Sequence, residues 1–132
     1  MFALLEHQTA TPPATPGRPV ADTVHWDLLI EVPDQPRLAT WRLADNPLTA
    51  DAPIVAERIQ DHRHVYLEYE GPLTRDRGFV HHLDHGAAHI INLAGDELHV
   101  ALEGAWLQGQ YRIYRDEAGT LLFERIAEPD RD

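Results

Sequence analysis

The sequence contains neither cysteine nor lysine, and each absence excludes particular chemistry. Without cysteine there are no disulfide bonds, thiolate metal sites or cysteine nucleophiles. Without lysine there is no Schiff base, nucleotidyl-lysine intermediate or P-loop. All 11 basic residues are therefore arginines, set against 22 acidic residues, and the formal net charge is -11. This balance disfavours broad binding to a nucleic-acid backbone, although a metal ion or a local arginine cluster could still create a positive pocket.

Long apolar runs and a sustained helical period are also missing. No run approaches the length of a membrane span, and the apolar stretch at residues 1–6 is too short for a secretory signal. We therefore expect a soluble, cytoplasmic protein with no membrane contact. A chain of 132 residues is long enough for one domain with a substantial core. We expect that domain to span residues 1–127, followed by a polar tail at 128–132.

Short apolar runs separated by turn signals make up most of the chain. Such spacing is typical of antiparallel sandwiches and barrels. The sequence therefore predicts an all-β (mainly β) protein, a small antiparallel β-barrel of about eight strands. The candidate strands are residues 2–6, 24–31, 37–43, 54–60, 65–70, 79–83, 88–93, 97–102, 107–115 and 120–126, with a turn at 84–86; for residues 54–60 a short helix is the alternative. A loop rich in Pro, Thr and Ala at residues 8–23 connects the first two.

Alternation along the strand predicted at residues 24–31 separates its side chains into two faces. One face carries an apolar set suited to a core: Trp26, Leu28 and Ile30. The other face carries His25 and Asp27, roughly 6–7 Å apart along the strand. An imidazole and a carboxylate at that spacing can bind one metal ion. The alternative is a His-Asp pair on the protein surface.

His7, at the end of the first predicted strand, would complete a three-ligand site with His25 and Asp27. Two imidazoles and one carboxylate leave coordination positions open for water or substrate, and they suit manganese, zinc or iron(II). The alternative for His7 is an isolated surface histidine, because the proline-rich spacer does not fix its distance from His25.

A second group of polar residues follows the strand predicted at 54–60. If the next strand begins at His62, then His62, His64 and Tyr66 share one face. They could hold a phosphate oxygen or supply a proton to a leaving group. The alternative is a tyrosine at the core edge beside solvated histidines. We expect the other five histidines to lie on the surface and the three tryptophans to pack in the core or at the barrel ends: His81, His82, His85, His89, His99, Trp26, Trp41 and Trp106.

The order and spacing of these motifs resemble the 3′-phosphoesterase domain of bacterial DNA ligase D and its small stand-alone relatives. The segments that match are His7, His25-Trp26-Asp27-Leu28, Trp41, Asp61-His62-Arg63, Tyr66 and Tyr69-Glu70-Gly71. The resemblance implies a compact barrel with a crevice at one side. It also implies a manganese ion, with another divalent metal such as zinc as the alternative, held by His7, His25 and Asp27. His62 and Tyr66 would lie on the phosphate side.

The activity implied by the resemblance is removal of phosphates or ribonucleotides from 3′ ends of DNA or RNA-tipped DNA in end repair, with a separately encoded ligase or polymerase as partner. The ligase domain has an arginine two residues after the metal aspartate, where this chain has Leu29; Arg58 or Arg63 would replace it. Two alternatives remain open. One is a non-catalytic, metal-containing barrel that binds a repair partner or a small anionic ligand, and the other is a hydrolase of a small phosphorylated metabolite.

Overall fold

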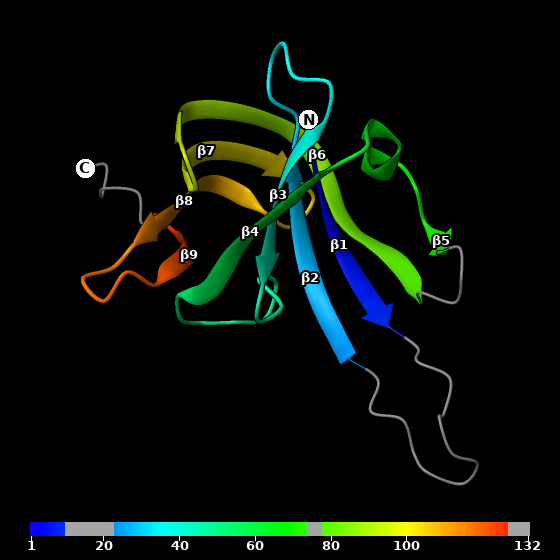
Figure 1. Cartoon of the computed structure of the whole chain (residues 1–132), viewed down its shortest axis with the longest axis horizontal. Helices are drawn as coiled ribbons and strands as arrows, with labels where there is room; N and C mark the ends of the chain where they lie inside the picture. The colour runs from blue at the N-terminus through cyan, green and yellow to red at the C-terminus, as the bar shows by residue number, and fades with distance from the viewer. Residues whose placement is uncertain (10–22, 74–77, 127–132) are drawn as a thin grey trace, which may run out of the picture.

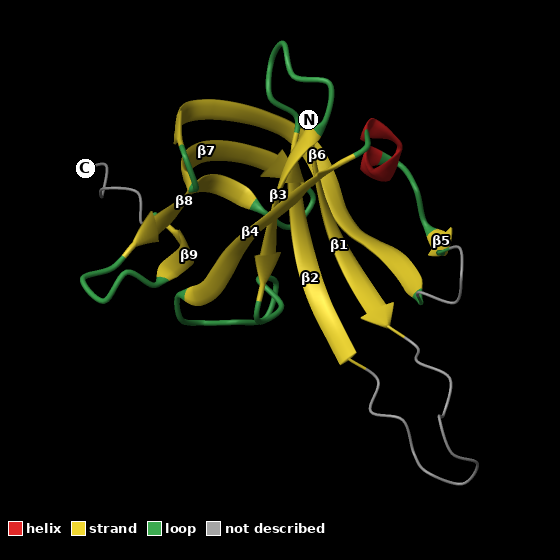
Figure 2. Cartoon of the chain, viewed as in Figure 1, coloured by secondary structure: helices red, strands yellow, loops and turns green. Residues whose placement is uncertain are grey.

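The computed structural model describes residues 1–9, 23–73 and 78–126, which form nine antiparallel strands and one short 3₁₀ helix (Figure 1). The strands are β1 (Phe2–Thr9), β2 (Thr23–Ile30), β3 (Leu38–Leu43), β4 (Ile54–His62), β5 (Gly71–Pro72), β6 (Phe79–Ala94), β7 (Glu97–Gly104), β8 (Gln108–Arg115) and β9 (Leu121–Arg125). The helix, η1 (His64–Leu67), lies between β4 and β5 (Figure 2). No helix in these ranges has the length and apolarity that a membrane span needs.

Eight strands close into a hydrogen-bonded ring in the order β1-β2-β3-β4-β9-β8-β7-β6, with β6 returning to pair with β1. β5 is attached to β6 outside the ring. The joint between β4 and β9 is the shortest in the ring, with two residue pairs, Ile54 with Phe123 and Val55 with Leu122. The predicted all-β barrel of about eight strands is confirmed. Most of the predicted loop at 8–23 and the tail at 128–132 lie outside the described residues.

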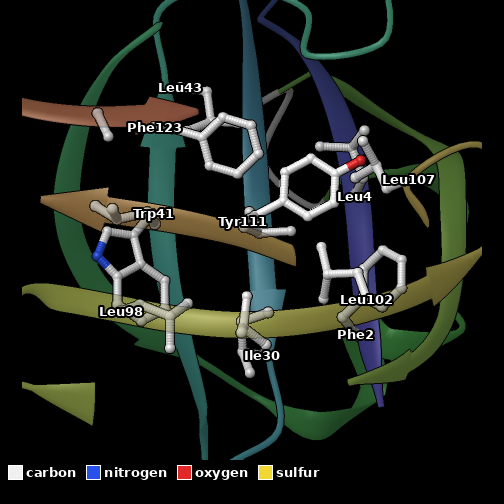
Figure 3. Packing of buried hydrophobic residues seen from close by; sticks show 14 of the residues in the cluster. Phe2, Leu4, Ile30, Trp41, Leu43, Leu98, Leu102, Leu107, Tyr111 and Phe123 are labelled. Atoms are coloured by element: carbon white, nitrogen blue, oxygen red, sulfur yellow. The ribbon is translucent and has the colours of Figure 1, made fainter. Parts of the chain in front are cut away.

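Alternation along the strands fills the ring with apolar side chains, several of which are drawn in Figure 3. Trp41 is fully buried there, and its indole N–H donates to the carbonyl oxygen of Asp96 at 2.9 Å. Trp26 packs against the same core while partly exposed. The predicted packing is therefore confirmed for these two tryptophans. It is wrong for Trp106, which is 72% exposed at the loop between β7 and β8.

A second, smaller apolar cluster lies on the outer face of β1 and β2, which we call the outer cluster. Its buried members are Ala3, Leu5, Leu29, Leu38 and Val80, and Tyr66, Leu67 and Leu73 pack against it. The strand register explains this position, because it pairs Ala3 with Leu29 and Leu5 with Asp27, out of phase with the core residues. The segment containing η1 and β5 thus covers part of the barrel's outer wall.

Two predictions about local structure are wrong. Residues 65–70 form η1 and a turn rather than a strand, with the N–H groups of Glu68 and Tyr69 donating to the carbonyl of Val65. The aromatic and β-branched residues there favour a strand. The chain instead uses a 3₁₀ turn as a connector, and that turn packs Tyr66 and Leu67 onto the outer cluster.

The turn predicted at residues 84–86 does not exist, because β6 runs without interruption through this segment. Asp84 is buried and receives hydrogen bonds from the backbone of the loop after β7. Gly86 lies against β7, where a Cβ atom would stand 2.1 Å from the carbonyl oxygen of Glu103. Both residue types are common in turns. Here Asp84 is a buried hydrogen-bond acceptor, and Gly86 allows the backbones of β6 and β7 to approach closely.

Candidate metal centre

The pairing of β1 with β2 brings the three predicted metal ligands together. His7 is the Cα partner of His25, and Leu5 is the partner of Asp27. His7 Nδ1 lies 2.8 Å from His25 Nε2, which lies 3.7 Å from Asp27 Oδ2. One ligand atom from each residue lies within 4.8 Å of the others, so the group could hold a metal ion. We call it the His/His/Asp group; within it, His7 is not an isolated surface histidine.

Burial controls the protonation of His25. The His25 side chain is 17% exposed and the Asp27 side chain 4%. The pKa of His25 is lowered from 6.5 to about 4, chiefly by burial; the Asp27 carboxylate acts in the opposite direction without compensating, and Arg42 contributes to the lowering. His25 is therefore neutral at ordinary pH, which is the state that binds a metal ion.

The two oxygens of the Asp27 carboxylate face different partners. Oδ1 is 3.3 Å from Arg42 Nε, while Oδ2 faces His25 and lies 4.0 Å from His62 Nε2. His62 Nδ1 is 2.9 Å from the carbonyl oxygen of Gln60, which can only accept. His62 Nδ1 therefore carries a proton that it donates to this carbonyl, which turns Nε2 toward Asp27. This orientation suits an imidazole that accepts a proton or approaches a cation.

A cavity of about 380 Å³ opens beside the group, and His7 and Asp27 contribute to its wall. The three residues predicted to act on substrate, His62, Tyr66 and Arg63, line the same cavity. The rings of His62 and Tyr66 meet edge to face with centroids 5.6 Å apart, and the Arg63 guanidinium stands 5.8 Å from the Tyr66 ring centroid. The predicted site residues are thus neighbours, and their roles in catalysis stay predictions.

Two residues named with this site lie elsewhere. His64 does not share a face with His62, because it lies on η1 and its Nδ1 is 3.5 Å from a carboxylate oxygen of Glu31. Arg58 does not line the cavity. Its guanidinium pairs with Asp61 at 3.0 Å, donates to Gly95 and stacks on the Trp41 ring. Of the two arginines suggested as replacements for the one lost at position 29, only Arg63 lines the cavity.

Two arginines that line the cavity, Arg37 and Arg42, are not among the site residues predicted from the sequence. Arg42 faces the site because β3 pairs with β2 in a register that sets it opposite Asp27. The sequence predicts this hairpin, and the hairpin alone indicates that Arg42 lies on the strand next to Asp27. Its register was not fixed, because a slip of one residue would place Trp41 opposite Asp27 and turn Arg42 to the other face.

The five remaining histidines do not belong to the His/His/Asp group. His85 and His89 are exposed, whereas the other three are partly buried. His82 Nε2 is 2.7 Å from the carbonyl oxygen of Leu67, and His99 Nε2 is 2.9 Å from the side-chain oxygen of Gln110. The predicted surface position is confirmed for the first two, while His82 has a structural contact that holds β6 to η1.

Comparison of the chain with protein-family models and with curated proteins found no match. No family is therefore identified. The fold is a β-barrel closed by a ring of eight strands. On its outer wall lies the His/His/Asp group, which could hold a metal ion.

Proposed function

We propose that this protein is a divalent-metal-dependent phosphoesterase that acts on 3′ ends of DNA or RNA-tipped DNA, with manganese held by His7, His25 and Asp27. One observation carries the proposal: the His/His/Asp group borders a cavity that is also lined by the guanidinium groups of arginines. A metal ion and an arginine both bind phosphate oxygens strongly, and here the residues for both lie side by side.

The donor set fits such an ion. Two imidazole nitrogens and one carboxylate oxygen suit manganese or zinc, and His25 needs no deprotonation above about pH 5 because its pKa is about 4. A metal bound there would withdraw charge from a phosphate oxygen and lower the pKa of a coordinated water.

The other cavity residues supply proton transfer and charge stabilisation in this proposal. His62, whose Nε2 faces Asp27, accepts a proton from the water that adds to phosphorus, and the ester oxygen that leaves on the opposite side takes its proton from solvent. Arg63 and the Tyr66 hydroxyl bind the non-bridging oxygens and stabilise their developing charge. Tyr66 is oriented for this by packing on the His62 ring and the outer cluster.

The test uses the full chain, stripped of metal by a chelator and reloaded with Mn²⁺ or Zn²⁺, and DNA duplexes ending in a 3′ phosphate or a 3′ ribonucleotide. We expect the metal-loaded protein to release the terminal group, and His25→Ala or Asp27→Asn to abolish release. His62→Ala should lower the rate roughly 10²–10⁴-fold. His99→Ala, a histidine outside the His/His/Asp group, is the matched control and should retain full activity.

Absence of release by the wild-type chain with either metal, or full activity of His25→Ala, would contradict the proposal. The second candidate is a non-catalytic metal-containing barrel, favoured by Leu29 and by the net charge of -11. Metal-dependent binding of the 3′-phosphorylated duplex without release would support that candidate. Cleavage of p-nitrophenyl phosphate but of neither DNA would instead indicate a small phosphorylated substrate.

A further inference from the structure

We propose that Arg42 and Arg37 form an anion subsite next to the His/His/Asp group, which binds the non-bridging oxygens of a terminal phosphate. Neither residue belongs to the motifs that resemble ligase D. This inference rests on the proposed function for the identity of the anion, and it adds the residues that replace the arginine lost at position 29.

Arg42 is held in place by the carboxylate that also serves the metal group. It is the Cα partner of Asp27 across β2 and β3, and its Nε lies 3.3 Å from Asp27 Oδ1. A guanidinium has five N–H groups, and this contact uses the one on Nε. Within the described residues, the two terminal nitrogens have no hydrogen-bond partner, and the side chain, 39% exposed, lines the cavity. Their four N–H groups are thus available to a ligand.

Among the described residues, the arginines away from the cavity have partners within the fold, and Arg125 donates to the carbonyl oxygen of Gln108. Arg58 pairs with Asp61, Arg112 with Glu124 and Arg115 with Asp96. In the described part of the chain, Arg37 has no hydrogen bond or ion pair, although it borders the cavity. Guanidinium groups with free donors therefore gather at the candidate site of a strongly acidic protein.

Leu29 explains why the positive charge has to come from another strand. The side chain is fully buried in the outer cluster and contributes no donor to the cavity. Neighbouring strands lie about 4.8 Å apart, so a long side chain on β3 can reach a ligand bound to residues on β2. Arg42 thus approaches the anion across the sheet rather than along β2.

The contact with Asp27 also predicts that lysine cannot replace Arg42. An arginine can contact Asp27 through Nε and still offer two parallel N–H groups to a phosphate. A lysine has one compact ammonium group, which cannot serve both partners in this way. Arg42→Lys should therefore behave like Arg42→Gln, although it keeps the charge.

The experiment measures binding of inorganic phosphate to the Mn²⁺-loaded full chain by calorimetry, together with the dissociation constant for Mn²⁺. We expect Arg42→Gln and Arg42→Lys to weaken phosphate binding at least 10-fold, while Mn²⁺ binding changes less than 3-fold. Arg37→Gln should weaken phosphate binding several-fold, because Arg37 is more exposed and has no anchor. Arg112→Gln is the matched control, because it removes the same charge from the ion pair between Arg112 on β8 and Glu124 on β9. It should leave the dissociation constants for phosphate and Mn²⁺ unchanged.

Three outcomes would overturn the subsite. They are unchanged phosphate binding in Arg42→Gln, a parallel loss of Mn²⁺ binding in Arg42→Gln and Arg42→Lys, and equal weakening in Arg112→Gln. The second would reduce Arg42 to a positioning residue for Asp27, and the third would indicate only a general charge effect. Phosphate binding that depends on Arg42 in a protein without esterase activity would uphold the subsite and reject the proposed phosphoesterase. Esterase activity that neither Arg42 variant changes would uphold the proposed phosphoesterase and reject the subsite.

Discussion

His25 shows how a single side chain is prepared for metal binding. Burial disfavours its charged form, and the neighbouring Asp27 carboxylate favours it; burial prevails, and the pKa falls to about 4. The effect is the one expected for a largely buried imidazole on β2, with His7 opposite it on β1 and the Asp27 carboxylate two residues along its own strand.

This pKa predicts how the stability of the metal-free protein depends on pH. An unfolded chain takes up a proton on His25 near pH 6.5, whereas the folded protein does so only near pH 4. Between these values the unfolded state binds more protons, so His25 makes the free energy of unfolding fall as the pH falls, by at most about 3 kcal/mol. Urea unfolding in chelator at pH 7, 6 and 5 should show this loss.

His25→Gln supplies the comparison for that measurement, because the carboxylates that also titrate are common to both proteins. The variant should lose less stability than the wild type between pH 7 and pH 5. Equal losses in the two proteins would show that His25 does not carry the effect.

How far the site could be predicted depends on how each residue is placed. Alternation within one strand is a local property, so the shared face of His25 and Asp27 followed from the sequence. His7 required the antiparallel register across a loop, and Arg42 required the register of a hairpin whose turn did not define it. Such registers depend on the hydrophobic pattern of two strands together, and a slip of one residue inverts every side chain.

Among the elements, β6 shows the limit of reading turns from composition. Asp84 lies within this strand of 16 residues and accepts the backbone N–H groups of Ala105, Trp106 and Leu107 at 2.8, 3.1 and 2.7 Å. It therefore fixes the loop between β7 and β8 against β6. Gly104 is needed beside it, because a Cβ atom there would stand 2.4 Å from Asp84 Oδ2.

Asp84→Asn should destabilise the barrel and leave the metal group intact. An amide retains one acceptor oxygen and turns a donor toward backbone N–H groups, so buried donors lose their partner at a cost of roughly 2–4 kcal/mol. Urea unfolding measures the loss, and Mn²⁺ titration should show an unchanged affinity, because Asp84 does not line the cavity. Asp96→Asn, at an exposed ion pair, should cost about 0–1 kcal/mol. A loss of similar size in both variants would contradict the role assigned to Asp84.

At the scale of the whole molecule, a bound metal would join β1 to β2 through side chains as well as through backbone hydrogen bonds. An ion that binds only the folded state stabilises it by about 2.7 kcal/mol at a concentration 100 times its dissociation constant. For a domain of this size we expect Mn²⁺ to raise the midpoint of thermal unfolding by roughly 10 °C. A thermal scan with and without chelator measures the shift.

Two variants make that scan specific. Asp27→Asn should show no rise on addition of metal, whereas His99→Gln should show the full rise because His99 lies outside the His/His/Asp group. An equal rise in both variants would indicate binding elsewhere on the protein.

The double pairing of β1 has a consequence for the order in which the protein assembles on the ribosome. β1 can pair with β2 as soon as both have emerged, so the His/His/Asp group can gather, and could capture an ion, before β6 is synthesised. The other edge of β1 pairs with β6, which begins at Phe79, 70 residues after β1 ends at Thr9. Until then the nascent chain exposes an unpaired strand edge of the kind that chaperones protect. Closure of the barrel is thus a late event, and an ion bound between the first two strands would precede it.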